Sequence, residues 1–123
     1  MKLHVSASAG LMTITAYDAG FVAVNGHRLT RSFLITPQRV VEDWPPVAAA
    51  TLTPADIEAI AGLACPVVLL GTGGHQCFPA RGLLAPLLAQ RIGVEVMDTP
   101  AACRTYNILM SEGRAVAAAL IVE

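Results

Sequence analysis

A short apolar run in the middle of the chain does most to limit how the chain can fold. Residues 67–70 read Val-Val-Leu-Leu, with Pro66 before them and Gly71 after them. A continuous run of this length, without alternation of polar residues, is typical of a strand that is buried on both faces. We therefore expect a buried strand here, inside a domain of the α/β class.

Helix and strand signals alternate around this run. Thr53-Pro54-Ala55-Asp56 combines an N-cap residue, a proline at the first helical position and an acid in the first turn. Thr99-Pro100 repeats the cap-plus-proline start. Pro86 falls inside a leucine-rich helical segment, which we expect to be kinked there. The predicted elements are helices over 54–62, 80–91 and 100–113 and strands over 67–70, 94–97 and 115–122. The second helix is expected to carry Leu83, Leu84, Leu87 and Leu88 on one stripe. Each connection holds a helix, which favours parallel strands, although the last strand could be antiparallel.

The first half of the chain has the pattern of β structure. Residues 12–17 alternate with period two, and a second strand is expected over 21–24. Asn25-Gly26 follows, which is the strongest short hairpin signal because both residues tolerate positive φ. The return strand is predicted over 27–36, ended by Pro37, with a short edge segment at 40–42.

Composition narrows the classes of partner. At 123 residues the chain fits one domain, 1–123, and charged residues are only 14% of it, which leaves room for an apolar patch that binds a protein partner or a second copy. Net charge is −1 with no basic run, so nucleic acid is not expected as a partner. No apolar stretch approaches the roughly 18 residues of a membrane helix, so no transmembrane segment is expected. The N-terminus lacks a signal-peptide pattern, and three cysteines without a CxxC indicate reduced thiols in the cytoplasm.

Two predicted strand ends form a candidate ligand site, because ligands of open α/β sheets lie beyond the carboxyl ends of the strands. The first is a glycine loop after the strand at 67–70, and the second leads into the helix that starts near residue 99. Their free backbone N–H groups could bind an anion or a polar group. The candidate ligand-binding residues are Gly71, Thr72, Gly73, Gly74, Asp98, Thr99, Arg104 and Asn107. The glycine loop matches neither a dinucleotide fingerprint nor a P-loop, and the alternative is a tight turn that serves only the fold.

Cys103 is the candidate catalytic residue, about four residues into the last predicted helix. The helix dipole would lower the pKa of its thiol, and Arg104 and Asn107 lie within one turn of it. The alternative is a small buried side chain at a helix–sheet contact. His75, Cys77 and Cys103 do not match a standard zinc spacing, so neither a metal nor another cofactor is expected.

The C-terminal run Met97-Asp98-Thr99-Pro100-Ala101-Ala102-Cys103-Arg104-Thr105-Tyr106-Asn107, continued by residues 108–121, resembles the hallmark motif of the family of Mth-like domains of unknown function. Its members include the mitochondrial NADH dehydrogenase (complex I) assembly factor 3 and the adipogenesis-associated Mth-like domain protein. Segments 18–21, 24–26, 33–37 and 69–73, and Trp44, resemble the same family, so the resemblance covers almost the whole chain.

The resemblance implies a three-layer Mth-like α/β fold. Its central sheet would be mixed and mostly parallel, with helices on its faces and an added N-terminal β-hairpin sheet. The function expected by analogy is a non-enzymatic binding or assembly factor for a respiratory complex. The alternative is a small-molecule-binding or thiol-dependent redox enzyme that uses the crevice between Gly71–Gly74 and Asp98–Arg104.

Overall fold

Two β-sheets and three α-helices make up the computed structural model, which describes residues 10–123. The central sheet has the order β5-β4-β8-β6-β7. Its strands are β4 (Phe33–Ile35), β5 (Val40–Val41), β6 (Val67–Gly71), β7 (Gly93–Met97) and β8 (Val116–Leu120). β6 is parallel to both β7 and β8, whereas β4 is antiparallel to β8 and to β5. The α/β class and the mixed sheet are therefore confirmed, and the last strand is parallel to its neighbour β6.

The run at 67–70 forms an interior strand of the sheet, between β8 and the edge strand β7. β6 pairs on both sides, and Val68, Leu69 and Leu70 are almost fully buried. Successive side chains of a strand point to opposite faces. Leu69 accordingly packs into one core and Val68 and Leu70 into the other. A strand covered on both faces needs apolar residues at every position, which is why this run does not alternate.

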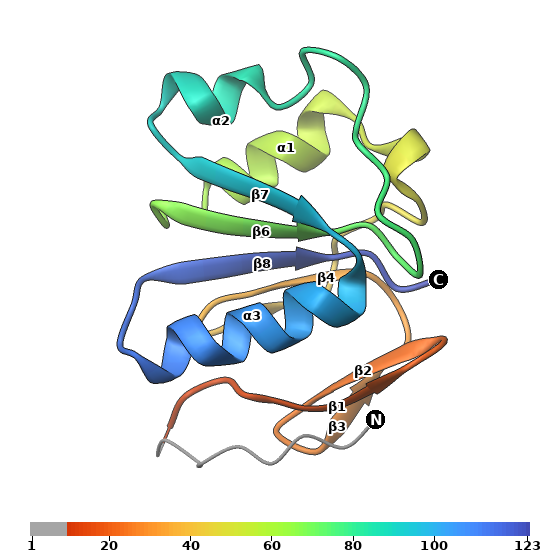
Figure 1. Cartoon of the computed structure of the whole chain (residues 1–123), viewed down its shortest axis with the longest axis vertical. Coiled ribbons are helices and arrows are strands. Elements are labelled where there is room, and N and C mark those ends of the chain that lie inside the picture. Colours follow the sequence, from red (N-terminus) through yellow and green to blue (C-terminus); the bar gives the residue numbers. More distant parts are fainter. Residues whose placement is uncertain (1–9) are drawn as a thin grey trace.

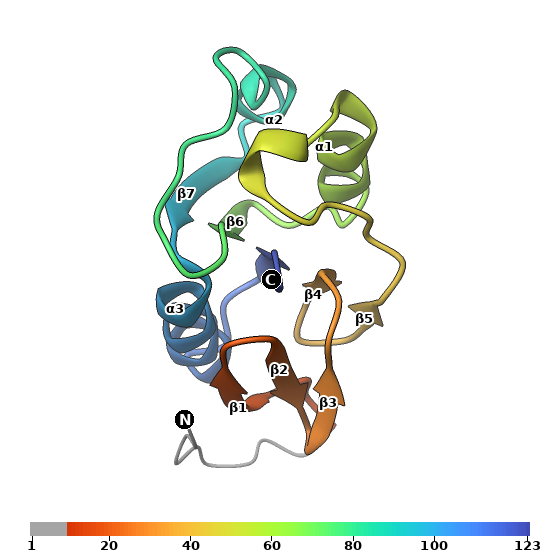
Figure 2. The same ribbon diagram turned by 90° about the vertical axis from the view of Figure 1, so that its right-hand side faces the viewer.

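Different elements cover the two faces of the central sheet (Figure 2). One face packs against α1 (Pro54–Ala61), α2 (Ala85–Ala89) and the short 3-10 helix η1 (Ala49–Thr51). The other packs against α3 (Thr99–Ser111) and the small sheet. The molecule therefore has three layers, with the central sheet in the middle (Figure 1). Among residues 10–123, no helix is long and apolar enough to cross a membrane.

The small sheet consists of β1 (Ile14–Asp18), β2 (Phe21–Val24) and β3 (His27–Leu29) in sequence order. Asn25 and Gly26 have φ values of 48° and 85°, as the predicted hairpin turn requires. The single return strand predicted over 27–36 is wrong, because the chain leaves the small sheet after Leu29 and enters the central sheet as β4. Between them the Ser32 hydroxyl accepts a hydrogen bond from the Val122 backbone N–H (3.0 Å). Alternation along one strand does not show where a chain passes from one sheet to another.

The helix starts follow local chemistry, but one predicted helix is much shorter in the structure. α1 begins with Thr53 and Asp56 in a reciprocal capping box, as expected. The helix predicted over 80–91 is only α2, with Pro86 in its first turn rather than in its interior. Proline is tolerated there because no intrahelical bond is lost, so the reason for expecting a kink does not apply. The leucine stripe is also partly wrong, since Leu87 is buried while Leu88 is 61% exposed.

Candidate binding cleft

An open cleft of about 790 Å³ lies where β6 and β8 end. One wall is the hairpin segment 17–22, and the opposite side comprises residues 73–75, 99–100 and 121–123. The turn between β1 and β2 lies at the same end of the molecule as the carboxyl ends of β6, β7 and β8 (Figure 1). The cleft thus occupies the position where open α/β sheets bind ligands, with the small sheet as its second wall.

The glycine loop and the start of α3 are in direct contact. The Thr99 hydroxyl accepts a hydrogen bond from the Gly73 backbone N–H (2.8 Å) and donates one to the Ile121 carbonyl (2.7 Å). The Thr99 N–H in turn donates to the Gly73 carbonyl (2.8 Å). A Cβ on Gly71 would lie 3.0 Å from Thr99 Cα and Oγ1, so glycine permits this close packing. Thr99 therefore fills the space between the two segments that the sequence predicted as a crevice.

Asp98 and Thr72 serve the local backbone. Asp98, rather than Thr99, is the N-cap of α3, and its Oδ1 accepts a hydrogen bond from the Ala101 N–H (2.8 Å). The Thr72 hydroxyl donates to the His75 carbonyl (2.6 Å) and accepts from the Cys77 N–H (3.0 Å). Both side chains thus hold the chain in shape beside the cleft, and neither is part of its lining.

Glu123 is a residue of the cleft that sequence reasoning missed. Its Oε1 accepts a hydrogen bond from the Gly74 backbone N–H (2.5 Å). Gly73 has a φ of +91°, and a Cβ there would collide with the Glu123 carboxylate. The glycine loop therefore does hold a carboxylate, which belongs to the chain itself. Residues 74 and 123 are far apart in sequence, so no local pattern could have predicted this contact.

Arg104 and Asn107 face the small sheet. Arg104 Nη1 donates a hydrogen bond to the Tyr17 hydroxyl (2.7 Å), and Tyr17 lines the cleft. Asn107 is 5% exposed and makes two hydrogen bonds to Ile14 of β1: its Nδ2 donates to the carbonyl (2.7 Å), and its Oδ1 accepts from the N–H (3.0 Å). Both residues fix the position of the hairpin wall, and neither lines the cleft.

Cys103 lies in the core between α3, the small sheet and the central sheet, with no exposed surface. Burial raises the pKa of its thiol to about 12, and the smaller effect of the nearby Arg104 charge does not reverse this. The expectation that the helix dipole lowers this pKa is therefore wrong. Near neutral pH the group is a neutral thiol packed as a small apolar side chain.

The ionisable groups that line the cleft are few. They are Tyr17, Asp18, His75 and Glu123, and neither lysine nor arginine is among the described lining residues. Within residues 10–123, no group of three histidine, cysteine or acidic side chains is placed to hold a metal ion. The described cleft combines backbone N–H groups, apolar side chains and two carboxylates.

Comparison with known proteins identifies the family. Residues 14–121 match the family described as "Protein of unknown function (DUF498/DUF598)". The chain belongs to this family. It is 34% identical over 112 residues to the bovine (Bos taurus) NADH dehydrogenase [ubiquinone] 1 alpha subcomplex assembly factor 3, a match covering 89% of this chain and 60% of the bovine protein. The chain therefore spans less than two thirds of the length of that curated relative.

Solved structures of similar proteins have the same fold. A crystal structure from Bordetella parapertussis matches with a TM-score of 0.87 and 42% identity, covering 95% of this chain and all of that one. The solution structure of a Bordetella pertussis protein described as a Mth938-like domain matches with a TM-score of 0.82 and 38% identity, covering 98% of this chain and 91% of the other. The Mth-like fold and the resemblance inferred from the C-terminal motif are thus confirmed.

Proposed function

We propose that this protein is a non-enzymatic binding module that assists the assembly of a respiratory NADH dehydrogenase, and that the cleft is its binding site. The observation that carries the proposal is an open cleft of about 790 Å³, large enough to receive side chains of a partner segment. The similarity of the chain to the assembly factor named above also supports the proposal. The three cysteines are free thiols, which is the state that a reducing compartment maintains. We therefore propose that the protein acts in the cytoplasm.

Within this proposal the predicted ligand residues have different roles. Gly73, Gly74 and Thr99 line the cleft and would meet the partner. Arg104 and Asn107 are positioning residues, because they hold Tyr17 and β1 in the opposite wall.

The alternative function is a thiol-dependent redox enzyme built on Cys103. Such an enzyme needs a thiolate that a substrate can reach. Cys103 has no exposed surface and a raised pKa, and both properties oppose that role. A Cys103→Ala variant that supports assembly as well as the wild type would agree with the binding module, and loss of assembly by a folded variant would favour the enzyme.

A photo-crosslinking experiment tests the binding site directly. A photoreactive phenylalanine at position 21, in the cleft wall, is compared with one at Leu88, which is exposed on α2 at the other end of the molecule (Figure 1). We expect position 21, but not position 88, to crosslink to a subunit of the respiratory NADH dehydrogenase in cells of the native host. Equal adducts at both positions, or none to that enzyme at position 21, would contradict the proposal.

A further inference from the structure

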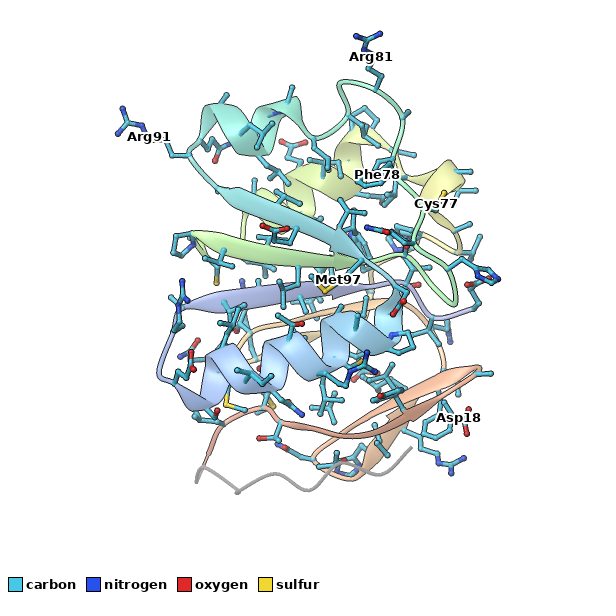
Figure 3. All side chains as sticks on the ribbon, viewed as in Figure 1. Asp18, Cys77, Phe78, Arg81, Arg91 and Met97 are labelled. Carbon is cyan, nitrogen blue, oxygen red and sulfur yellow. The ribbon has the colours of Figure 1, made fainter. Side chains whose placement is uncertain are left out.

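The charge of the cleft suggests which partner segment it accepts. Asp18 enters from the hairpin end, and Glu123 from the segment that follows β8. Figure 3 shows Asp18 at the tip of the hairpin, whereas Arg91 lies at the opposite end of the molecule. Two carboxylates thus line one cleft, and no lysine or arginine is among its described lining residues.

Each carboxylate is held by a neighbouring backbone N–H. Asp18 Oδ1 accepts from the Ala19 N–H (2.8 Å), and Glu123 Oε1 accepts from the Gly74 N–H (2.5 Å). A carboxylate has two oxygens and about four lone-pair positions, so one hydrogen bond leaves acceptor capacity for a ligand. Both residues are exposed, so a cation can reach them.

Two arginines lie close to the cleft, and each is engaged with an aromatic side chain of its wall. The Arg28 guanidinium lies over the Phe21 ring, 4.0 Å from its centroid. Arg104 donates a hydrogen bond to the Tyr17 hydroxyl. Neither arginine lines the cleft. The two cations therefore support the wall from outside, and the charge inside comes from the carboxylates.

The rest of the lining is largely apolar. Phe21 and Pro100 are half-buried, and Val22, Ile121 and Val122 are buried. A surface that combines apolar contact with fixed carboxylates favours a partner that is itself apolar and carries a positive charge.

We infer that the cleft binds a protein segment in which apolar side chains adjoin a lysine or an arginine. The apolar side chains contact the apolar part of the lining, and the cation is attracted by the negative charges of Asp18 and Glu123. This inference rests on the proposed function, since it names the chemistry of the segment that an assembly partner would offer. In this arrangement the Glu123 carboxylate binds the cation of the partner and does not serve only to occupy the glycine loop.

Matched synthetic peptides test the inference. The probes are nine-residue peptides of alternating leucine and lysine, and the same peptide with glutamate in place of lysine. Binding to the full chain is followed by NMR through the backbone amides of Val22, Gly73 and Gly74, which line the cleft. We expect the lysine peptide to shift these amides and the glutamate peptide to leave them in place.

Charge-neutral variants provide the second arm. Asp18→Asn combined with Glu123→Gln keeps an oxygen acceptor for each backbone N–H and removes both charges. Since exposed ion pairs are individually weak, we expect the double variant to bind the lysine peptide about fivefold more weakly. The control is Glu58→Gln combined with Glu112→Gln, which removes two exposed charges outside the cleft and should leave affinity unchanged.

Three results would overturn the inference. The first is equal binding of both peptides, and the second is equal weakening of binding by both double variants. The third is a shift of the cleft amides that depends only on protein concentration and accompanies a doubling of the protein's mass in solution. The last would assign the cleft to a second copy of the chain. The proposed function is tested separately by the crosslink from position 21. An adduct to the respiratory enzyme through a segment without lysine or arginine would keep that function and reject this inference.

Discussion

Asn107 offers the sharpest test of how the hairpin wall is held. Its amide makes two buried hydrogen bonds to the backbone of Ile14, at 2.7 and 3.0 Å. In Asn107→Leu both Ile14 groups lose their partner, while the number and branching of the side-chain heavy atoms are kept. An unsatisfied buried backbone group costs about 1–3 kcal/mol, so two cost roughly 4 kcal/mol. Burial of the leucine offsets about 2 kcal/mol of this.

The expected net loss is about 2 kcal/mol in the free energy of unfolding, which for a domain of this size lowers Tm by about 8 °C. Urea and thermal unfolding can be followed by the fluorescence of Trp44, which is the only tryptophan and is buried. Hydrogen exchange of the Ile14 amide should accelerate more than that of β6 amides, because the Ile14 N–H loses its acceptor on α3.

The control is Ile108→Asn, at the next position of the same helix, where the side chain is 57% exposed. It should change the stability by less than about 0.5 kcal/mol. If Asn107→Leu lowered Tm no more than this control, the two hydrogen bonds would not hold the hairpin and the reasoning would be refuted.

Four further predictions concern the cysteines, α3 and the glycine loop. Iodoacetamide at pH 8 should label the exposed Cys77 in the native protein but reach Cys103 only after unfolding. The pKa of Cys103 is about 12 in the folded state against an ordinary 9.0, so the free energy of unfolding should fall as pH rises from 9 towards 12. Urea titrations at several pH values should show a smaller fall for Cys103→Ala. Thr99→Val should lower the stability by about 1–3 kcal/mol in calorimetry and Thr99→Ser much less, since only serine keeps the bridging hydroxyl; equal losses would contradict the bridge. Gly73→Ala should cost about 1–2 kcal/mol because φ is +91°, whereas Gly74→Ala, where no positive φ is required, should be nearly neutral in the same assay.

The elements that sequence predicts well are those specified by neighbouring residues. The Thr53–Asp56 capping box and the Asn25-Gly26 turn each involve four residues or fewer. Their geometry follows from side chains that bond the adjacent backbone or tolerate positive φ. The apolar run at 67–70 also predicts its own environment, because an unbroken run of apolar residues indicates a strand that is covered on both faces.

The elements that sequence predicts poorly depend on what packs against them. The leucines near Pro86 fit a long helix by spacing, yet the chain turns at Gly82, which has a φ of +82°, and the helix starts only at Ala85. Residues 27–36 fit one strand by alternation, yet they belong to two sheets. In both cases a periodic pattern fits more than one backbone path, and the contacts of the folded chain select one of them.

The α/β class, the family and the approximate place of the cleft at the ends of two strands could be predicted from the amino-acid sequence. Which residues line the cleft depends on how the layers pack. The helix period puts Cys103, Arg104 and Asn107 close together, but the position of the small sheet makes Cys103 a core residue and turns Arg104 and Asn107 towards the hairpin. Glu123 enters the cleft through a contact with Gly74, 49 residues away in sequence. Such contacts depend on how the layers pack, and that information is spread over the whole chain.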